Sequence, residues 1–341
     1  MKRLRKVLIV TDAWHPQVNG VVRSIERTVA ELERRGIETV LLTPAAFRTL
    51  PMPGYDEIAL SVTGPGPVYR RIEAADADAI HLATEGPLGI YARRWCVRHR
   101  VPFSTAYHTQ FPEYLRARLP VPVGFTYGIL RWFHRPASAC LVGTPYLKAL
   151  LEQRGFTNAE LWPKGVDTTL FHPDKRAPLD YPGPVFLYVG RVAVEKNIEA
   201  FLALDLPGTK LVVGGGPLLE QLRGKYPTAF FLGPQTGEDL SRLFASADVF
   251  VFPSRTDTFG LVLLEALASG TPVAAFPVTG PIDVIGAAPV GVLDEDLRRA
   301  ALAALDMPRA GCRAYAEQFS WAASTDAFLA HLPLIDRKVS A

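Results

Sequence analysis

The stretch KVLIVTDAWHPQVNGVVRSIERTVAELERRGIETVLLT (residues 6–43) decides the fold. It opens on an apolar run, KVLIV, and a second one, ETVLLT, closes it. Between them the apolar residues of a helical pattern recur every three or four positions, at Val22, Ile25, Val29 and Leu32. Gly36 then ends the helix. Because a strand that is apolar throughout is buried on both faces, this strand–helix–strand unit predicts a parallel sheet.

The same alternation continues along the chain and then starts again. We expect a helix at 91–100 and further strands at 79–83, 102–108, 140–144 and 160–167. After the turn-rich stretch 168–184, strands are expected at 185–190, 210–215, 229–233, 248–254 and 272–276. The pattern predicts two doubly wound α/β domains, 1–167 and 185–320, joined by a linker at 168–184. We expect the C-terminal helix, within 321–341, to pack back on the first domain.

Composition limits the class of protein. Of the 341 residues, 48% are apolar and 21% charged, which excludes a disordered chain. Cys96, Cys140 and Cys312 lie far apart without CxxC spacing, so we predict reduced thiols in a cytoplasmic protein and neither a zinc cluster nor a disulfide framework. The apolar run near the start is too short for a signal peptide, and no run approaches the ~18 residues of a membrane span.

Charge is divided unevenly between the two halves. Residues 1–167 hold 22 Lys and Arg against 15 Asp and Glu, a balance of +7. Residues 168–341 hold 15 against 19, a balance of −4, which gives the chain its net +3. Either the basic half meets an anionic surface or substrate, or this is ordinary solvated charge.

Two glycine turns are candidate phosphate sites. Gly20 stands where the first helix begins, and a glycine there lets backbone amides approach a phosphate. A second turn, Gly214 to Pro217, follows a strand of the second domain. Each also fits a plain turn of the chain. The GxGxxG fingerprint of a dinucleotide-binding domain is missing after the first strand, which argues against an NAD-dependent dehydrogenase.

The second domain places charged residues where its strands end. In VGRVAVEKN (189–197), Arg191 ends a strand and Lys196 begins a helix. In PSRTDTFGLVLLEALASG (253–270), Asp257 follows another strand and Glu265 lies two turns into the next helix. Any one of these residues alone would be an ordinary surface charge. Because ligands bind beyond the carboxyl ends of parallel strands, their joint placement predicts a ligand site.

These segments resemble the retaining glycosyltransferases of family 4, which have the GT-B fold of two Rossmann-like domains facing across a cleft. The resemblance covers nearly the whole chain, through VNGVVRS (18–24), HLATEGPLG (81–89), AYHTQFPEY (106–114), WPKGVDTTLF (162–171), YVGRVAVEKN (188–197), DTFGLVLLEALASG (257–270) and FSW (319–321). Within the family the chain is similar to enzymes that glycosylate membrane lipids, such as sulfoquinovosyl and glucuronosyl diacylglycerol synthases, and to α-mannosyltransferases.

The resemblance implies that Arg191 and Lys196 bind the diphosphate of a nucleotide-sugar donor. Glu265 would hold the ribose hydroxyls, and Asp257 would hold hydroxyls of the transferred sugar. The remaining implied donor contacts are Gly20 at the diphosphate, the backbone of Thr258, Phe259 and Gly260 at the sugar, Gly233 and Pro234 at the base, and His108 beside the breaking bond. The family usually has Glu where this chain has Asp257, and the shorter side chain leaves the sugar undecided.

Negative charge grows on the departing nucleoside diphosphate, and either a divalent metal or fixed cations can stabilise it. Two DxD strings occur, Asp76-Ala77-Asp78 and Asp294-Glu295-Asp296. The first precedes an expected strand and the second lies in a polar turn. We therefore expect no metal and no cofactor, with Arg191 and Lys196 neutralising the leaving group.

The resemblance also implies retention of the anomeric configuration. A double displacement would need a carboxylate nucleophile, and Glu85 and Glu113 stay open for that role in the first domain. We expect front-face attack instead, in which the departing phosphate takes the proton of the acceptor. His108 would then stabilise the electron-poor sugar; otherwise it is a core histidine at a strand end.

The segment 114–151 has no Asp or Glu and interleaves basic with aromatic residues. These are Arg116, Arg118, Phe125, Tyr127, Arg131, Trp132, Phe133, Arg135 and Lys148. The mixture predicts contact with an anionic lipid surface, and so a peripheral protein on the inner face of the cytoplasmic membrane. A basic helix packed on the first domain is the alternative. No nucleic-acid recognition motif accompanies the charge.

The expected reaction is transfer of a sugar to a membrane lipid such as diacylglycerol or a ceramide, giving an α-glycoside. A UDP-sugar is the favoured donor and GDP-mannose the other candidate. One alternative is an α-mannosyltransferase, or another glycosyltransferase with a glycan acceptor. A second is a nucleotide-sugar epimerase or a non-catalytic sugar-nucleotide-binding protein.

Overall fold

The computed structural model describes residues 4–16, 19–52, 55–108, 122–257 and 259–336. The chain divides into two compact units: Met1–Pro163 with Trp321–Ala341, called the first unit here, and Lys164–Ser320, called the second unit. Each unit has a six-stranded sheet whose paired strands all run parallel. This confirms the predicted pair of doubly wound α/β domains.

The sheet of the first unit has the strand order β2-β1-β5-β6-β7-β8. Its strands are β1 (Lys6–Val10), β2 (Glu38–Leu42), β5 (Ala79–Leu82), β6 (Ser104–Tyr107), β7 (Ala139–Val142) and β8 (Ala159–Leu161). Its helices are α1 (Gly20–Arg34), α2 (Pro65–Ala75), α3 (Pro87–His99), α5 (Val123–His134), α6 (Pro145–Gln153) and α14 (Trp321–Ala330). A hairpin of β3 (Arg48–Met52) and β4 (Tyr55–Val62) is added, which the sequence analysis did not anticipate.

Strand β1 explains why the opening run is apolar throughout. Val7 and Ile9 pack on one face of the sheet with residues of α1 and α14, and Leu8 and Val10 pack on the other with α2 and α3. Alternate side chains of a strand point to opposite faces, so a sheet covered by helices on both faces needs apolar residues at every position.

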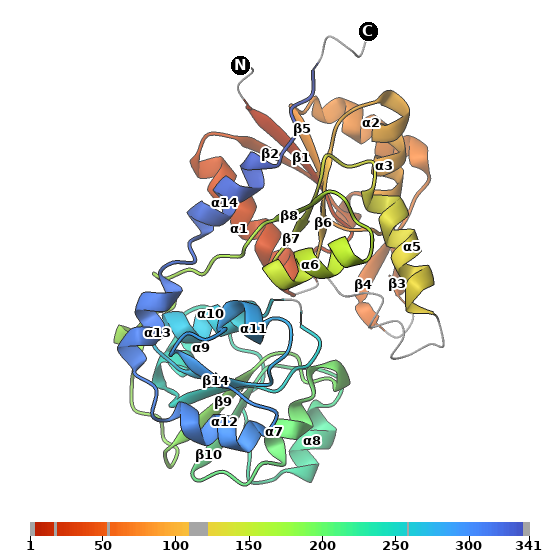
Figure 1. Ribbon diagram of the computed structural model, residues 1–341. Coiled ribbons are helices and arrows are strands. Elements are labelled where there is room, and N and C mark those ends of the chain that lie inside the picture. The colour runs from red at the N-terminus through yellow and green to blue at the C-terminus, as the bar shows by residue number, and fades with distance from the viewer. Residues whose placement is uncertain (1–3, 17–18, 53–54, 109–121, 258, 337–341) are drawn as a thin grey trace. The chain divides into compact units, whose positions relative to one another are not determined.

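Helix α14, close to the C-terminus, lies beside α1 (Figure 1). Phe328 of α14 is fully buried in the same apolar cluster as Ile25 of α1. At the rim of this contact, the Arg35 guanidinium donates to the Asp326 carboxylate at 2.5 Å and to the Ala322 carbonyl at 2.8 Å. The last helix therefore completes the core of the first unit.

The sheet of the second unit has the strand order β11-β10-β9-β12-β13-β14. Its strands are β9 (Val185–Val189), β10 (Thr209–Val213), β11 (Phe230–Phe231), β12 (Val249–Phe252), β13 (Val273–Ala275) and β14 (Gly291–Leu293). Its helices are α7 (Ile198–Leu202), α8 (Leu219–Lys225), α9 (Gly237–Ser246), α10 (Leu261–Ala268), α11 (Pro281–Val284), α12 (Leu297–Ala304) and α13 (Arg309–Ala316). The strand order reverses between β9 and β12, and in the first unit between β1 and β5.

The segment 168–184, predicted as a linker, lies within the second unit. Phe171 is 5% exposed and belongs to the apolar cluster that contains β9 and α10. The Arg313 guanidinium donates to the carbonyls of Thr168 and Phe171, both at 2.9 Å. This part of the chain is thus held by apolar burial and by hydrogen bonds to its backbone.

The glycine turn after β10 is required by close backbone contact. A Cβ on Gly214, whose φ is +137°, would lie 1.9 Å from the Gly190 carbonyl oxygen. A Cβ on Gly216 would lie 2.4 Å from the Val192 carbonyl oxygen. The Val192 amide in turn donates to the Gly215 carbonyl at 2.9 Å. The turn therefore packs directly on the loop that follows β9, and this close packing explains why the turn needs glycines.

We expect Gly214→Ala to lower the free energy of unfolding by about 2 kcal/mol or more, because the added methyl forces the two loops apart. Gly224→Ala is the matched control, since Gly224 lies in α8 with nothing within 4 Å of an added Cβ. It should change stability by no more than about 1 kcal/mol, and in the stabilising direction. Denaturant unfolding measures both. Equal effects of the two substitutions would contradict the packing argument.

Candidate active site

The carboxyl ends of β9 and β12 bring together three of the residues predicted to bind a donor. Arg191 follows β9 by two residues, Lys196 ends a short 3-10 helix (Val194–Lys196), and Asp257 lies in the loop after β12. The Lys196 Nζ lies 2.5 Å from the Asp257 Oδ1, with the two side chains 25% and 17% exposed. In an open parallel sheet, ligands bind where the strand order reverses, which is between these two strands.

Two further hydrogen bonds join the loops after β9 and β12. The Asn197 side-chain amide donates to the Pro253 carbonyl at 3.0 Å, and the Thr256 hydroxyl donates to the Glu195 carbonyl at 3.2 Å. Asn197 is in the left-handed region, with φ +49°, where Asn is among the better tolerated side chains. The Lys196–Asp257 pair thus sits on loops held together by backbone-directed contacts.

Arg191 has a carboxylate and a phenol as neighbours. Its guanidinium lies 3.8 Å from the Glu195 carboxylate, and its carbonyl accepts a hydrogen bond from the Tyr188 hydroxyl at 2.7 Å. Burial raises the pKa of Tyr188, and the nearby negative charges of Asp257 and Glu195 raise it further. The phenol therefore stays protonated and keeps donating to the backbone at Arg191.

Helix α10 supplies the second predicted carboxylate. It starts after Gly260, which is in the left-handed region at φ +78°, and Glu265 is 8% exposed on the helix. Phe259 is also 8% exposed and belongs to the apolar core of the second unit. Thr258 lies outside the described residues.

The predicted base site lies next to the glycine turn. The Gly214 amide donates to the Gly233 carbonyl at 2.9 Å, and a Cβ on Gly215 would contact the Pro234 ring at 3.3 Å. The loops after β9, β10 and β11 therefore lie side by side. Arg191, Lys196, Asp257, Gly233 and Pro234 thus lie in loops at this one edge of the sheet, whereas Glu265 is buried within α10 and Phe259 in the apolar core.

In the first unit, Gly20 and His108 have different surroundings. Gly20 is the exposed first residue of α1, and the Asn19 side chain caps that helix by accepting from the amides of Val21 and Val22, both at 3.0 Å. His108 follows β6, and its ring centroid lies 5.5 Å from that of the buried Trp162.

Asp12, two residues after β1, was not among the predicted site residues. Its carboxylate accepts from the Leu88 amide at 2.9 Å and from the Gly89 amide at 3.2 Å, which caps α3. Burial raises the pKa of Asp12, although these hydrogen bonds act against the shift. A Cβ on Gly86 would lie 2.4 Å from the carboxylate carbon. The signal was an aspartate at a strand end together with the paired glycines of EGPLG (85–89).

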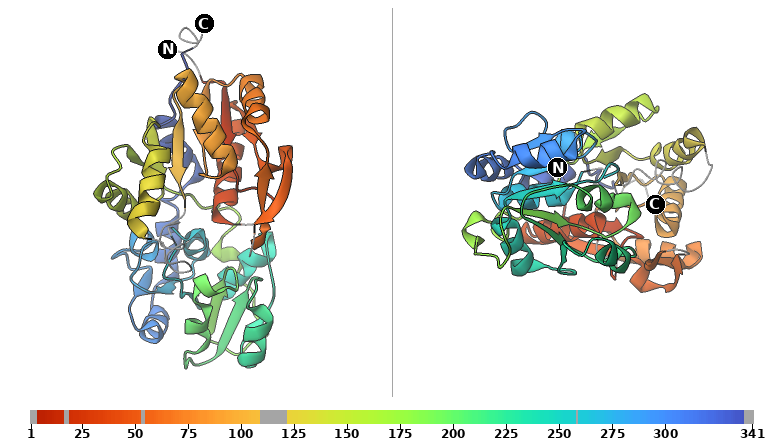
Figure 2. Two further views of the ribbon diagram at one scale, coloured as in Figure 1. Left: turned by 90° about the vertical axis from the view of Figure 1, so that its right-hand side faces the viewer. Right: turned by 90° about the horizontal axis from the view of Figure 1, so that it is seen from below.

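Helix α5 carries part of the predicted basic and aromatic surface. Phe125, Ile129 and Trp132 are 65%, 50% and 52% exposed and share one face of the helix by their spacing. Helix α5 lies beside α3 (Figure 2). The Arg93 guanidinium of α3 lies over the Trp132 ring at 3.8 Å and donates to the Trp132 carbonyl. Phe133, expected on this surface, is buried instead at 2%, because it points to the opposite face and into the core.

The other basic residues of the predicted surface divide into two groups. Arg131 and Arg135 are exposed, and Arg131 donates to the Arg154 carbonyl at 2.8 Å. Arg116 and Arg118 lie outside the described residues, as does Glu113. Among the described helices, each is too short or too polar to cross a lipid bilayer.

Both DxD strings have structural contacts. The Asp78 carboxylate accepts from the amides of Arg5 and Lys6 at 3.0 and 3.1 Å, at the amino ends of β1 and β5. Asp294 pairs with Arg299 at 2.5 Å, and Asp296 caps α12. The Asp78 contacts lie at the amino ends of the strands, whereas Asp294 directly follows β14, at the carboxyl edge of the second sheet, where its carboxylate is paired with Arg299.

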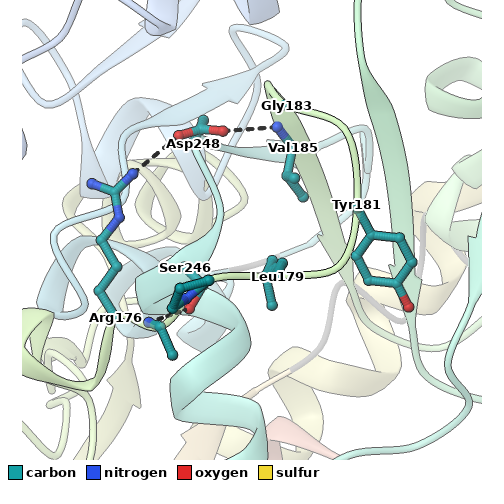
Figure 3. A pocket seen from close by; sticks show the side chains of 9 residues that line it. Arg176, Leu179, Tyr181, Gly183, Val185, Ser246 and Asp248 are labelled. Carbon is teal, nitrogen blue, oxygen red and sulfur yellow. Dashed lines mark hydrogen bonds and ion pairs between the residues drawn. The ribbon is translucent and has the colours of Figure 1, made fainter.

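A hollow of about 350 Å³ lies at the opposite, amino-terminal edge of the second sheet (Figure 3). Asp248, at its rim, accepts from the Val185 amide at 2.8 Å and lies 3.4 Å from the Arg176 guanidinium. The Ser246 hydroxyl accepts from the Ala177 amide at 3.0 Å. These polar groups hold the segment 176–185 against the sheet, so we do not assign the hollow to the donor.

Comparison with known proteins gives two family matches and several relatives. Residues 18–170 match the family described as Glycosyltransferase Family 4, and residues 173–305 match Glycosyl transferases group 1. Sulfoquinovosyl transferase SQD2 of Arabidopsis thaliana is 31% identical over 314 residues, which cover 83% of this chain and 62% of that protein. A GDP-mannose-dependent α-mannosyltransferase of Mycobacterium tuberculosis is 30% identical over 316 residues, 84% of this chain and 83% of that one.

An α-monoglucosyldiacylglycerol synthase of Streptococcus pneumoniae is 25% identical over 313 residues, 79% of this chain and 70% of that one. Among solved structures, a sucrose-phosphate synthase from Thermosynechococcus elongatus has a TM-score of 0.76 at 22% identity, covering 96% of this chain and 98% of that one. HepE of Anabaena, in complex with UDP and glucose, has a TM-score of 0.71 at 16% identity with the same coverage. At these identities the solved structures show a shared fold.

Proposed function

Because this chain belongs to glycosyltransferase family 4 and is a glycosyltransferase of GT-B fold, we propose that it transfers a sugar from a nucleotide-diphosphate donor to a membrane lipid, forming an α-glycoside with retention. The single observation that carries the proposal is the Lys196–Asp257 pair, with Arg191 beside it, at the point where the second sheet reverses its strand order. This arrangement offers fixed positive charge for a diphosphate next to a carboxylate for sugar hydroxyls.

Arg191 and Lys196 would stabilise the negative charge that grows on the departing diphosphate. Fixed cations aimed at developing charge need no reorganisation during the reaction, and one such donor contributes about 3–4 kcal/mol. Asp257 holds the Lys196 ammonium in place and also presents a carboxylate to the sugar. Glu265, buried on α10, would accept from the ribose hydroxyls.

Retention would follow from front-face attack. The bond from the anomeric carbon to the β-phosphate oxygen breaks, and the acceptor oxygen bonds to the same face of that carbon. The acceptor's proton moves to the departing phosphate oxygen, so no separate base is needed. His108, at the end of β6, would stabilise the electron-poor sugar. Glu85, left open above as a nucleophile, lies 3.2 Å from the buried His134 ring, which engages one of its oxygens.

Two observations support a lipid acceptor: the name of one relative and the exposed apolar face of α5. The synthase of Streptococcus pneumoniae is named for a diacylglycerol product. The exposed apolar face of α5, flanked by Arg131, Arg135 and Arg93, combines apolar side chains with positive charge, as a monotopic membrane contact requires. We propose peripheral binding to the inner face of the cytoplasmic membrane through this face.

The donor base has two candidates. We favour a UDP-sugar, following the resemblance to lipid-glycosylating members of the family. GDP-mannose is the second candidate, because three GDP-mannose-dependent α-mannosyltransferases are 28–30% identical over at least 84% of this chain. The mannosyltransferase alternative would allow a glycan acceptor. Transfer assays with each donor separate the two.

We expect Lys196→Ala to lower kcat at least about a hundredfold, because the leaving diphosphate loses a fixed cation. Lys175→Ala is the matched control. Lys175 also pairs with a carboxylate, that of Glu238 at 2.6 Å, and it is 24% exposed against 25% for Lys196. Its variant should keep near-normal turnover in steady-state assays. Near-normal kcat in Lys196→Ala would remove the proposed role.

We expect the product of an α-linked donor and diacylglycerol to carry an α-glycosidic bond. Proton NMR of the purified glycolipid measures the anomeric coupling that distinguishes the two linkages. A β-linked product would refute retention, and consumption of donor without any acceptor would favour an epimerase or hydrolase.

We expect co-sedimentation with lipid vesicles to rise with their anionic lipid content and to weaken with salt. Phe125→Ser should reduce the bound fraction several-fold, because it removes an exposed apolar side chain from α5. Leu50→Ser is the control, since Leu50 is 61% exposed against 65% for Phe125 but lies on the β3–β4 hairpin. A bound fraction that changes neither with anionic lipid content nor with salt would argue against membrane binding through the exposed face of α5.

A further inference from the structure

The first unit has a strand-order reversal of its own, between β1 and β5. Two carboxylates follow these strands. Asp12 is 9% exposed, and its carboxylate accepts hydrogen bonds from the backbone amides at the start of α3. That of Glu85, three residues after β5, belongs to a side chain that is 32% exposed. Glu85 is therefore the more open of the two at an edge where parallel sheets bind ligands.

A fully buried histidine lies behind Glu85. The His134 ring, at the end of α5, has no solvent exposure. Its Nε2 lies 3.2 Å from the Glu85 Oε1, and its Nδ1 lies 2.9 Å from the Thr105 hydroxyl oxygen on β6. Three elements separated in the sequence thus converge on one imidazole.

The hydrogen-bond pattern around this imidazole favours its protonated form. The Thr105 hydroxyl donates to the Ala139 carbonyl at 3.4 Å, so its oxygen accepts from the His134 Nδ1. An ionised carboxylate only accepts, so Glu85 accepts from Nε2. Both ring nitrogens thus have an acceptor within hydrogen-bond distance, an arrangement that the protonated ring satisfies. Burial alone would lower the pKa of His134, but the neighbouring Cys140 sulfur and Glu85 carboxylate raise it to about 10.

The consequence is a carboxylate that is both charged and fixed. A buried imidazolium needs a counter-ion, because an unpaired buried charge is strongly destabilising. Glu85 is that counter-ion, and its partial exposure leaves the group accessible at the edge of the sheet. Such a carboxylate accepts hydrogen bonds from hydroxyl groups and offers no donor to a phosphate.

We propose that Glu85 binds the hydroxyl-bearing headgroup of the acceptor and selects a neutral headgroup over a phosphorylated one, with His134 as its positioning residue. This inference rests on the proposed function, in which the donor occupies the second unit. It also gives the basic residues and the acidic Glu85 of the first unit different roles. The basic face of α5 meets the anionic membrane, and the acidic Glu85 meets an uncharged acceptor such as diacylglycerol.

The test compares Glu85→Gln with Glu160→Gln. Glu160 is also an ion-paired glutamate of the first unit, 2.9 Å from Lys148 and 40% exposed. Kinetics are measured with diacylglycerol in mixed micelles and a nucleotide-sugar donor, and UDP or GDP binding is followed by thermal shift. We expect Glu85→Gln to raise the KM for diacylglycerol about tenfold or more, because a charge-assisted hydrogen bond is lost. The donor KM and the nucleotide-induced thermal shift should stay unchanged.

Two further variants separate binding from folding. Glu85→Asp keeps the charge and should retain more acceptor affinity than Glu85→Gln. Thr105→Val removes the hydroxyl that orients His134, so it should raise the acceptor KM while leaving the nucleotide-induced thermal shift intact. With phosphatidylglycerol as acceptor, wild-type transfer should be weaker than with diacylglycerol, and Glu85→Gln should narrow that difference.

The outcomes are distinguishable. An acceptor KM in Glu85→Gln that matches the Glu160→Gln control overturns this inference and leaves the proposed function standing. A raised donor KM, or a collapse of kcat at unchanged acceptor KM, also overturns it, in favour of a donor contact or a nucleophile. Wild-type protein that transfers no sugar to any lipid contradicts the proposed function and this inference together.

Discussion

Close backbone packing around the end of β9 is the constraint on which the candidate site depends. The loop after β9 lies against a glycine turn that has no room for side chains. The Tyr188 hydroxyl also donates a hydrogen bond to the backbone of this loop. Only with this loop fixed can Lys196 reach the carboxylate of Asp257 on the neighbouring loop. The charged groups of the site are thus positioned by uncharged contacts. These contacts fix the backbone of the cationic site, and the ion pair between Lys196 and Asp257 then orients the two side chains.

The fold was largely predictable because its signals are local. Runs such as VLIV (7–10) and VFLYV (185–189) are apolar at every position, and only a sheet covered on both faces requires that. The placement of Arg191, Lys196 and Asp257 near one edge of the second sheet was predictable for a related reason, while their role in binding a donor stays a prediction. They stand in the loops that follow such runs, and the strand ends of a parallel sheet converge at one edge. The β3–β4 hairpin gave no comparable signal, since its strands pair with each other and belong to neither main sheet.

The features that escaped prediction depend on contacts between distant segments. Phe133 lies on the core-facing side of α5, opposite its exposed apolar face, but the composition of the segment gave no indication of which face meets the core. The interaction between Glu85 and His134 joins residues 49 apart in the sequence, on a loop and a helix. Neither residue type is unusual alone. Only the burial of the imidazole, which the sequence does not reveal, turns an ordinary glutamate into a fixed anion.

The return of the chain to the first unit has a consequence for how the protein can be taken apart. The second unit is one uninterrupted segment of the chain. Near its beginning, the Val166 amide donates a hydrogen bond to the carbonyl of Phe319, near its end, and Val166 forms a parallel β-bridge with Ser320. Its entry and exit are therefore neighbours, separated by about one strand spacing. In architectural terms the second unit is an insertion into the first, a layout that suits excision as an independent module. After such an excision, the two segments of the first unit would need only a short linker to form one continuous chain.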